Sequence, residues 1–381
     1  MTLRTLAVYA RATVLETLTP IVADAIARKV APGAVVLVSN AGQTQLHHAF
    51  GQVSEGGPAT QLDTIYDAAS VTKAVATSAL FMTLVAEGAI ALDSKVASHL
   101  PELAGPGKEH IELRHLLGHA SGLPAHVHFF DQIWAGEMGG ASSSWQALAN
   151  MAGAEPLAYK TGTQTIYSDL GYILLARLIE RLTGKRLEQA FAERVAGPLG
   201  LGDTQFVDLA AGAVHPQPDR VAPSGEGPDG SGGRVMLHGQ VHDDNARSGG
   251  GISGHAGLFT TASDLACFAQ ALCDAYQDRP SVVPGEVVRQ FWTTAAAPKT
   301  SWRMGFDTPS STPGVSHAGD HWPASGVGHL GFTGTAMWLA PKQNRFVIIL
   351  TNRTYYSWEP AGIKALRRSL MHAICEALPA L

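Results

Sequence analysis

The stretch that decides the fold is Asp67-Ala68-Ala69-Ser70-Val71-Thr72-Lys73. Ser70 and Lys73 are three residues apart, so both side chains lie on one face if Ser70 opens a helix. This spacing places an alcohol beside an amine, the minimum for nucleophilic catalysis by a serine. A helix N-terminus adds positive potential and free backbone N–H groups, which stabilise negative charge. The stretch therefore predicts a serine nucleophile at the start of a helix.

The residues after Lys73 favour this hypothesis over the simpler one, in which Ser70 is only an N-cap. Ser-x-x-Lys arises by chance, and serine is a common N-cap. Residues 74–86, however, carry no charge and little amphipathic contrast, which is typical of a helix buried on all sides. A lysine at the start of such a helix is costly unless it has a partner or a task. It can act as a base only where burial or positive potential lowers its pKa.

The composition indicates a globular protein with a large core. The chain has 381 residues, of which 45% are hydrophobic and 15% charged. This length predicts two or three domains, or one interwoven pair. The net charge of −5 argues against nucleic acid or an anionic membrane as the main partner.

The cysteine content and the hydropathy of the sequence predict the cellular compartment of the protein. The three cysteines have no metal-ligand spacing, which is typical of small buried residues in a reducing compartment. No uncharged stretch is long enough to span a bilayer, and the first residues do not have a signal-peptide pattern. We expect a cytoplasmic protein, or a periplasmic or secreted one if a leader precedes this sequence.

Strand patterns lie near both ends of the chain, and the middle is mostly helical. Strands are predicted at 34–38, 45–50, 328–339 and 345–350, and helices at 12–30, 171–182 and 361–378. This order predicts an α/β (α+β) fold, with an antiparallel sheet built from both chain ends and flanked by helices. The predicted domains are 1–66 with 297–381 for the sheet, and 67–296 for an inserted helical region. The active site is expected between them.

Two further stretches stand out. Tyr167-Ser168-Asp169 precedes the helix at 171–182, and an N-cap role explains Ser168 or Asp169 but not Tyr167. Residues 249–257 are rich in glycine, which lets a backbone approach another backbone or a ligand closely.

Three ordered motifs together resemble those of serine β-lactamases and penicillin-binding proteins, in particular the class C β-lactamase and DD-peptidase branch. Ser70-Val71-Thr72-Lys73 matches the first motif, Ser-x-x-Lys. Tyr167-Ser168-Asp169 matches the second, which is Tyr-x-Asn in most members. His329-Leu330-Gly331 matches the third, Lys-Thr-Gly, in its His-x-Gly variant. The resemblance covers about residues 10–375 and implies a β-lactamase/transpeptidase-like fold.

The resemblance also implies a mechanism. Ser70 attacks a carbonyl and forms an acyl-enzyme that water later hydrolyses. Lys73 and Tyr167 share the proton relay, and either can be the base. His329 lines the site, and the backbone N–H groups of Ser70 and Phe332 form the oxyanion hole. The substrate-binding positions implied are Asp169, Leu330, Gly331 and Phe332. No metal or organic cofactor is expected.

Two departures from the family pattern bear on the substrate. Asp169 replaces an asparagine, and a carboxylate cannot donate the amide hydrogen bond that holds a substrate acylamide. Leu330 replaces a hydroxyl residue that helps to bind a substrate carboxylate. We therefore expect a serine hydrolase that prefers esters, with a D-Ala-D-Ala carboxypeptidase or a β-lactamase as the alternative. Its partner is a small ester, amide or short peptide, and the oligomeric state stays open.

Hypotheses from other functional classes compete with this one. The 16 histidines suggest the hypothesis of a zinc hydrolase. His126, His128 and Asp131 are the best candidate ligands, but the sequence has no second close set of ligands. A non-catalytic binding protein on the same scaffold is the stronger rival, because fold does not imply function. Such a protein is expected to have lost Ser70, Lys73 or Tyr167, and all three are present.

Overall fold

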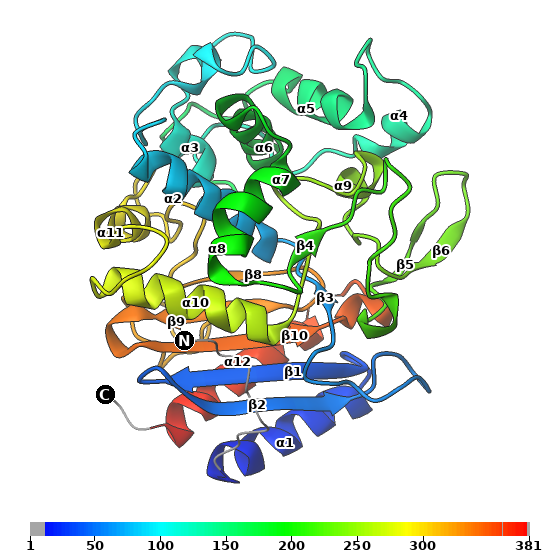
Figure 1. Ribbon diagram of the computed structural model, residues 1–381, viewed down its shortest axis with the longest axis vertical. Helices are drawn as coiled ribbons and strands as arrows, with labels where there is room; N and C mark the ends of the chain where they lie inside the picture. The colour runs from blue at the N-terminus through cyan, green and yellow to red at the C-terminus, as the bar shows by residue number, and fades with distance from the viewer. Residues whose placement is uncertain (1–11, 360, 379–381) are drawn as a thin grey trace.

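The centre of the molecule is a five-stranded antiparallel sheet in the order β2-β1-β10-β9-β8 (Figure 1). The computed structural model describes residues 12–359 and 361–378; the remaining residues of the predicted sheet domain lie outside this range. The strands are β1 (Gly33–Asn40), β2 (Gln43–Gly51), β8 (Val327–Leu330), β9 (Ala336–Ala340) and β10 (Arg345–Thr351). Because β1 pairs directly with β10, the predicted sheet from both chain ends is confirmed.

Strand β10 shows why the sheet has a core on each side. Its side chains alternate between the faces, as the two-residue period of a strand requires. Phe346, Ile348 and Leu350 join the core shared with the helical region. Val347 and Ile349 join the second core, on the opposite face. The uninterrupted apolar run in this strand therefore reflects burial on both faces.

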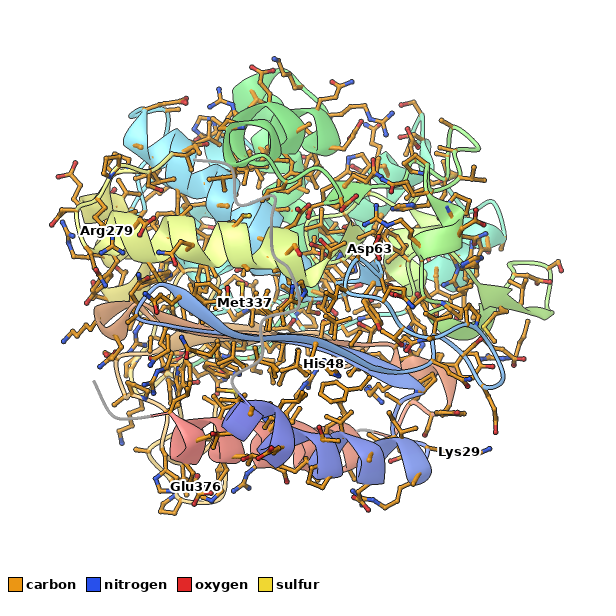
Figure 2. The ribbon with its side chains drawn as sticks, turned by 60° about the horizontal axis from the view of Figure 1, so that its bottom comes forward. Lys29, His48, Asp63, Arg279, Met337 and Glu376 are labelled. Atoms are coloured by element: carbon orange, nitrogen blue, oxygen red, sulfur yellow. The ribbon has the colours of Figure 1, made fainter. Side chains whose placement is uncertain are left out.

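Helices cover both faces of the sheet. α1 (Ala12–Ala27) and α12 (Ala361–Ala377) pack side by side on one face, and α10 (Ala262–Tyr276) lies on the other (Figures 1 and 2). The terminal helices predicted at 12–30 and 361–378 are confirmed within three residues. α10 packs against β1 and β10 although its residues belong to the range predicted as the helical region.

The helical region stands above α10 in Figure 1. Its helices are α2 (Ala79–Ala86), α3 (Leu113–Leu117), α4 (Phe130–Trp134), α5 (Ser144–Ala154), α6 (Asp169–Thr183), α7 (Leu187–Phe191), α8 (Gly197–Leu199), α9 (Asp244–Ser248) and α11 (Gly285–Thr293). A small second sheet has the order β3-β7-β4, with β3 at Tyr66–Asp67, β7 at Leu258–Thr260 and β4 at Gln205–Phe206. A separate hairpin consists of β5 (Gly225–Pro228) and β6 (Arg234–Leu237). A wide, π-helical turn at Lys73–Ser78 leads into α2 and is buried throughout, as the uncharged sequence predicted.

The prediction of one continuous strand over 328–339 is wrong. The chain forms the hairpin β8–β9, with the five-residue turn Gly331–Thr335 between the strands. The Gly331 N–H donates to the Thr335 carbonyl at 2.7 Å, and Gly334 has a φ of +104°, where a side chain is strained. The apolar residues on both sides concealed the two glycines that mark this turn.

Gly254 shows the close backbone approach that the glycine-rich stretch predicted. A Cβ atom built on Gly254 would lie 2.2 Å from the carbonyl oxygen of Tyr172 on α6. The Gly254 carbonyl in turn accepts a hydrogen bond of 2.7 Å from the Thr77 hydroxyl, next to the start of α2. This glycine therefore lets three segments of the helical region meet without a gap.

We predict that Gly254→Ala lowers the free energy of unfolding by about 1–3 kcal/mol, because the added methyl group must push α6 away. Gly202→Ala is the matched control: its Cβ meets no atom within 4 Å, and its φ is ordinary. That variant should stay within about 0.5 kcal/mol of the parent. Urea denaturation followed by circular dichroism measures both. Equal stability of the two variants would contradict the packing described here.

Candidate active site

Ser70 follows a sharp turn between a strand and a helix. β3 ends at Asp67, and Ala69 then adopts a φ of +47°, a left-handed conformation that is uncommon for a residue with a side chain. The Asp67 carboxylate accepts the Ala69 N–H at 2.8 Å and so holds the turn. The Lys73 N–H donates to the Ser70 carbonyl, which closes the first helical turn. The predicted position of Ser70 at a helix start is confirmed.

Lys73 is fully buried and satisfied by three acceptors. Its Nζ lies 2.7 Å from Asp169 Oδ1, 3.1 Å from Ser70 Oγ and 3.1 Å from the carbonyl oxygen of His255. A lysine ammonium has three protons to donate, so each of these contacts uses one of them. The side chain is therefore held as a cation next to the candidate nucleophile.

The charges of Lys73 and Asp169 stabilise each other. Burial lowers the pKa of Lys73, but the charges of Asp169 and Tyr167 outweigh it and raise the pKa above its ordinary value. Burial raises the pKa of Asp169, but Lys73 and a hydrogen bond from His126 lower it well below its usual range. Asp169 Oδ2 lies 3.1 Å from His126 Nδ1, so this carboxylate bridges the lysine and a histidine of the cleft. It occupies the position where the family has an asparagine.

Tyr167 stands over the ammonium and beside Ser70. Lys73 Nζ lies 4.8 Å from the centre of the Tyr167 ring, and both Lys73 and Ser70 act to lower the pKa of the phenol. Burial raises the pKa of Tyr167, and the Lys73 charge opposes that shift. The rings of His119 and Trp302 pack against Tyr167, with centroids 4.6 Å and 5.1 Å away. These contacts fix the orientation of the phenol.

His329 lies on the edge strand β8 and is buried. Its Nδ1 is 2.8 Å from the carbonyl oxygen of Leu330, which can only accept, so Nδ1 carries the proton and Nε2 a lone pair. Burial, helped by the Lys73 charge, lowers the pKa of His329 to about 3. His329 is therefore neutral at physiological pH, unlike the lysine of the family motif.

Two pockets meet at Ser70, Tyr167 and Phe332. The larger, about 520 Å³, is lined by polar and aromatic side chains that include His126, Phe130, Asp169, Asp243 and Trp358. The smaller, about 370 Å³, lies on the side of His329, Leu330 and Gly331 and includes Arg353, Lys364 and Arg367. All predicted site residues thus line one continuous cleft, except Lys73, which is buried beneath Ser70.

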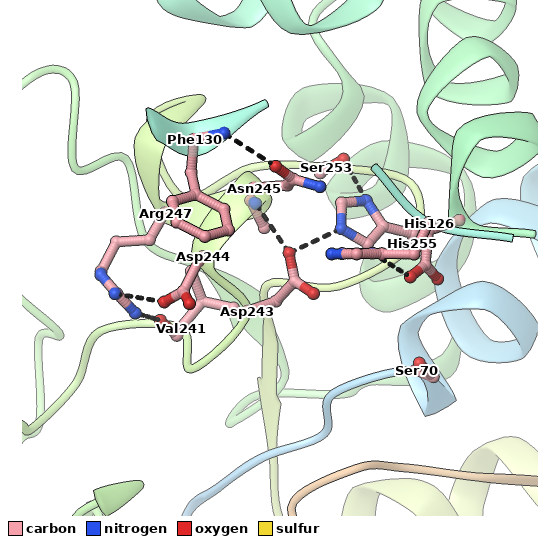
Figure 3. Close-up of polar contacts among 12 residues, drawn as sticks. Ser70, His126, Phe130, Val241, Asp243, Asp244, Asn245, Arg247, Ser253 and His255 are labelled. Atoms are coloured by element: carbon pink, nitrogen blue, oxygen red, sulfur yellow. Dashed lines mark hydrogen bonds and ion pairs between the residues drawn. The ribbon is translucent and has the colours of Figure 1, made fainter. Parts of the chain in front are cut away.

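A hydrogen-bonded chain supports the floor of the larger pocket (Figure 3). Ser253 Oγ lies 2.8 Å from His255 Nδ1, and His255 Nε2 lies 2.7 Å from Asp243 Oδ1. Asp243 also accepts the Ala246 N–H and so caps α9. Because the His255 carbonyl is one of the three acceptors for Lys73, this chain fixes the position of the lysine.

A family model described as Beta-lactamase matches residues 19–370. The chain belongs to the beta-lactamase family. The N-acetylmuramyl-L-alanine amidase of Bacillus subtilis (strain 168) is 31% identical over 344 residues, covering 85% of this chain and 78% of that protein. A protein of Escherichia coli (strain K12) named as a D-alanyl-D-alanine carboxypeptidase is 31% identical over 306 residues, covering 77% and 70%.

A solved structure confirms the beta-lactamase fold. The structure of a family VIII carboxylesterase superposes with a TM-score of 0.70 at 20% identity, covering 98% of this chain and 99% of that one. The relatives named above are hydrolases, and this chain is a serine hydrolase of the beta-lactamase family. None of the described helices is both long and apolar enough to cross a bilayer.

The structure also brings residues to this beta-lactamase cleft that sequence patterns did not identify as site residues. His119 packs behind Tyr167, and its Nδ1 accepts the Ser168 N–H at 3.1 Å. Arg353 and Arg367 lie far from the family motifs in sequence, and only the fold shows that they reach the cleft. His126, first considered as a zinc ligand, bonds to Asp169 instead. Within residues 12–359 and 361–378, no group of three or more His, Cys, Asp or Glu side chains is arranged to hold a metal ion.

We predict that His242, which lines the larger pocket, makes stability fall with acid. Burial, together with the Arg247 charge, lowers its pKa to about 4. In the unfolded chain the His242 imidazole is protonated near pH 6.5, whereas in the folded chain it is protonated only near pH 4. The free energy of unfolding therefore falls as the pH falls through this window. This linkage amounts to about 2 kcal/mol at pH 5.

His242→Gln should reduce the loss of unfolding free energy between pH 7 and pH 5 by that amount. The exposed His99→Gln serves as the control and should leave the slope unchanged. Urea denaturation at a series of pH values measures how the free energy of unfolding depends on pH. A His242→Gln protein with the parental slope would contradict the buried, neutral state of this histidine.

Proposed function

We propose that the protein hydrolyses neutral esters through an acyl-enzyme on Ser70. The observation that carries this proposal is the contact of 3.1 Å between Lys73 Nζ and Ser70 Oγ at the floor of an open cleft. A buried ammonium fixed against a serine hydroxyl has a clear chemical use, because it stabilises the alkoxide that forms as the serine attacks.

The direction of the hydrogen bonds favours Tyr167 as the group that takes the Ser70 proton. Lys73 donates to Ser70 Oγ, so the serine hydroxyl proton is free to point elsewhere, and its other polar neighbour is the Tyr167 oxygen. Tyr167 can take this proton only as the phenolate, the anion that the Lys73 charge favours and that burial disfavours. The same relay then returns the proton to the leaving alcohol, and later removes a proton from the water that attacks the acyl-enzyme.

The backbone N–H groups of Ser70 and Phe332 are the proposed oxyanion hole. Neither N–H donates a hydrogen bond within the described part of the chain, and both residues line the cleft. One preorganised donor of this kind is worth about 3 kcal/mol of barrier reduction.

The polar groups around Ser70 favour a neutral substrate. Asp169 is committed to Lys73 and His126, so it has no amide N–H to offer an acylamide. His329 is neutral, and Leu330 offers no hydroxyl. A substrate carboxylate placed there would be desolvated with weaker compensation than in relatives that have Lys-Thr-Gly.

The larger pocket favours a bulky acyl group. Phe332 is 48% exposed and Trp358 is 44% exposed, and both line this pocket beside Phe130. Large apolar side chains exposed at the mouth of a pocket gain free energy when a ligand covers them. A volume of about 520 Å³ accommodates a branched or aromatic acyl chain.

A D-alanyl-D-alanine carboxypeptidase is the second candidate. The smaller pocket contains the cationic side chains Arg353, Lys364 and Arg367. Both arginines are hydrogen-bonded to backbone carbonyls, so they favour a carboxylate on the leaving group through their positive potential. The Escherichia coli relative carries that name.

Within this proposal, the cleft lies between the sheet domain (1–66 and 297–381) and the helical region (67–296). Three unpaired cysteines support a cytoplasmic location.

We predict that Ser70→Ala abolishes ester turnover while Tm stays within about 2 °C of the parent, because only one hydroxyl is lost. Intact mass spectrometry after mixing with a short-chain nitrophenyl ester or a fluorophosphonate should show one covalent adduct on the parent. The Ser70→Ala protein should show none, and the exposed Ser98→Ala control should behave as the parent does. Unchanged turnover by Ser70→Ala would refute the mechanism, and a parent without turnover or adduct would favour a binding protein.

We predict that a neutral ester has a kcat/KM at least about 10-fold higher than its carboxylate analogue with the same acyl group, since about 1.4 kcal/mol of uncompensated desolvation gives that ratio. Initial rates for the two substrates, and for a D-Ala-D-Ala peptide, measure the preference. A preference for the carboxylate or the peptide would instead support the carboxypeptidase.

A further inference from the structure

We infer that Arg367 is a positioning residue that holds the Phe332 N–H in the orientation needed for the oxyanion hole. The inference rests on the proposed function of Ser70 and extends it to a side chain on the C-terminal helix α12. Nothing in the three family motifs identifies this residue, which follows His329 by 38 positions.

Arg367 directs its guanidinium at the turn between β8 and β9. Its NH2 donates to the carbonyl oxygens of Gly331 and Thr335, both at 2.6 Å, and its Nε donates to the Gly334 carbonyl at 3.2 Å. The side chain is only 5% exposed. Within the described part of the chain it has three backbone carbonyls and no carboxylate as hydrogen-bonding partners.

The bond to Gly331 determines where the Phe332 N–H points. The Gly331 carbonyl and the Phe332 N–H belong to the same peptide unit, which is trans, so they point in opposite directions. Since the carbonyl is held by Arg367, the N–H points away from Arg367. That N–H has no acceptor within the described residues, and Phe332 lines the cleft together with Ser70. A cation on the carbonyl also polarises the amide and makes its N–H a stronger donor.

Arg353 fixes the next peptide in the same manner. Its Nε donates to the Phe332 carbonyl at 2.6 Å, and its guanidinium lies 4.4 Å from the centre of the Phe332 ring. The peptides on both sides of Phe332 are therefore held by buried arginines. Burial, helped by the Arg353 charge, lowers the pKa of Arg367 to about 9.

The turn is also tied to the backbone that precedes Ser70. The Thr333 hydroxyl donates to the Asp67 carbonyl at 2.8 Å, and the Thr335 hydroxyl donates to the Ala68 carbonyl at 2.9 Å. A Cβ atom on Gly331 would lie 2.5 Å from the Ala68 carbonyl oxygen, so the two segments touch. The two N–H groups of the hole thus belong to backbones held at a fixed separation, and Arg367 sets the rotation of one of them.

A turn with glycines at two of its five positions needs hydrogen bonds such as those from Arg367 to keep its peptides in one orientation. Without Arg367, the Gly331 carbonyl would keep the longer bond of 3.1 Å from the Gly334 N–H. Because glycine has few steric barriers, the Gly331–Phe332 peptide could then rotate more easily. After that rotation a carbonyl oxygen would face the developing oxyanion and repel it. Arg367 opposes the rotation, because turning the peptide would break a charge-assisted hydrogen bond inside the protein.

The test compares Arg367→Gln and Arg367→Lys with Arg368→Gln. Arg368 is the next residue on α12, and it binds the Gly314 carbonyl and Asp320 away from the cleft. Rates are normalised to the number of serines that a fluorophosphonate labels, which removes any effect of misfolded protein. Affinity for a boronic acid, whose tetrahedral adduct places an oxygen in the hole, is measured beside KM.

We expect kcat per labelled site to fall by about 10- to 100-fold in Arg367→Gln, with KM changed less than about threefold, since a full oxyanion donor is worth about 10²- to 10³-fold. Boronate affinity should fall by a similar factor. Arg367→Lys should be intermediate, because an ammonium keeps the charge but loses the planar fork. Arg368→Gln should match the parent in all three measurements.

Unchanged kcat per labelled site and unchanged boronate affinity in Arg367→Gln would overturn the inference. If neither Arg367 variant folds, a crystal structure of the parent with the boronate bound decides it. A boronate oxygen within hydrogen-bonding reach of the Phe332 N–H, with the Gly331 carbonyl on Arg367, supports the inference, and any other orientation of that peptide overturns it. Failure of the proposed function is recognised separately, because the parent would then not be labelled at Ser70.

Discussion

The site depends on one buried ammonium. Lys73 is removed from water, and its charge is compensated by Asp169, Ser70 and the carbonyl of His255. These partners come from segments separated by up to 185 residues of chain, counted from Ser70 to His255. A buried charge that lost a partner would destabilise the fold by several kcal/mol, so the cation holds these segments together beside Ser70.

Asp169 gives this cleft its particular electrostatics. Where the Tyr-x-Asn motif of most members has an asparagine, this chain has a carboxylate that pairs with the buried lysine. The resulting ion pair leaves little net charge around Ser70, and the neutral His329 adds none. Further charged side chains line both pockets, among them Arg234 and Asp244 in the larger and Lys364 in the smaller.

The backbone around Ser70 is also fixed by hydrogen bonds. Ala69 adopts a left-handed conformation that the Asp67 carboxylate stabilises, and the turn after β8 is held by arginines at four carbonyls. The hydroxyls of Thr333 and Thr335 join the two segments. The edge of the sheet and the start of the buried helix therefore act as one rigid unit, which is what a preorganised oxyanion hole requires.

The sequence by itself indicated the strands β1, β2 and β10, the terminal helices and the position of Ser70 at a helix start, because these follow from local periodicity and from residues that are close in the chain. It also indicated Lys73 and Tyr167 through short motifs. It did not reveal the β8–β9 turn, since apolar residues on both sides hid Gly331 and Gly334 within a strand pattern. Only the tertiary structure decided that Asp169 neutralises Lys73, that burial lowers the pKa of His329 to about 3 and that Arg367 binds the turn. These properties arise from burial and from contacts between distant segments, and neither is encoded in the spacing of any single motif.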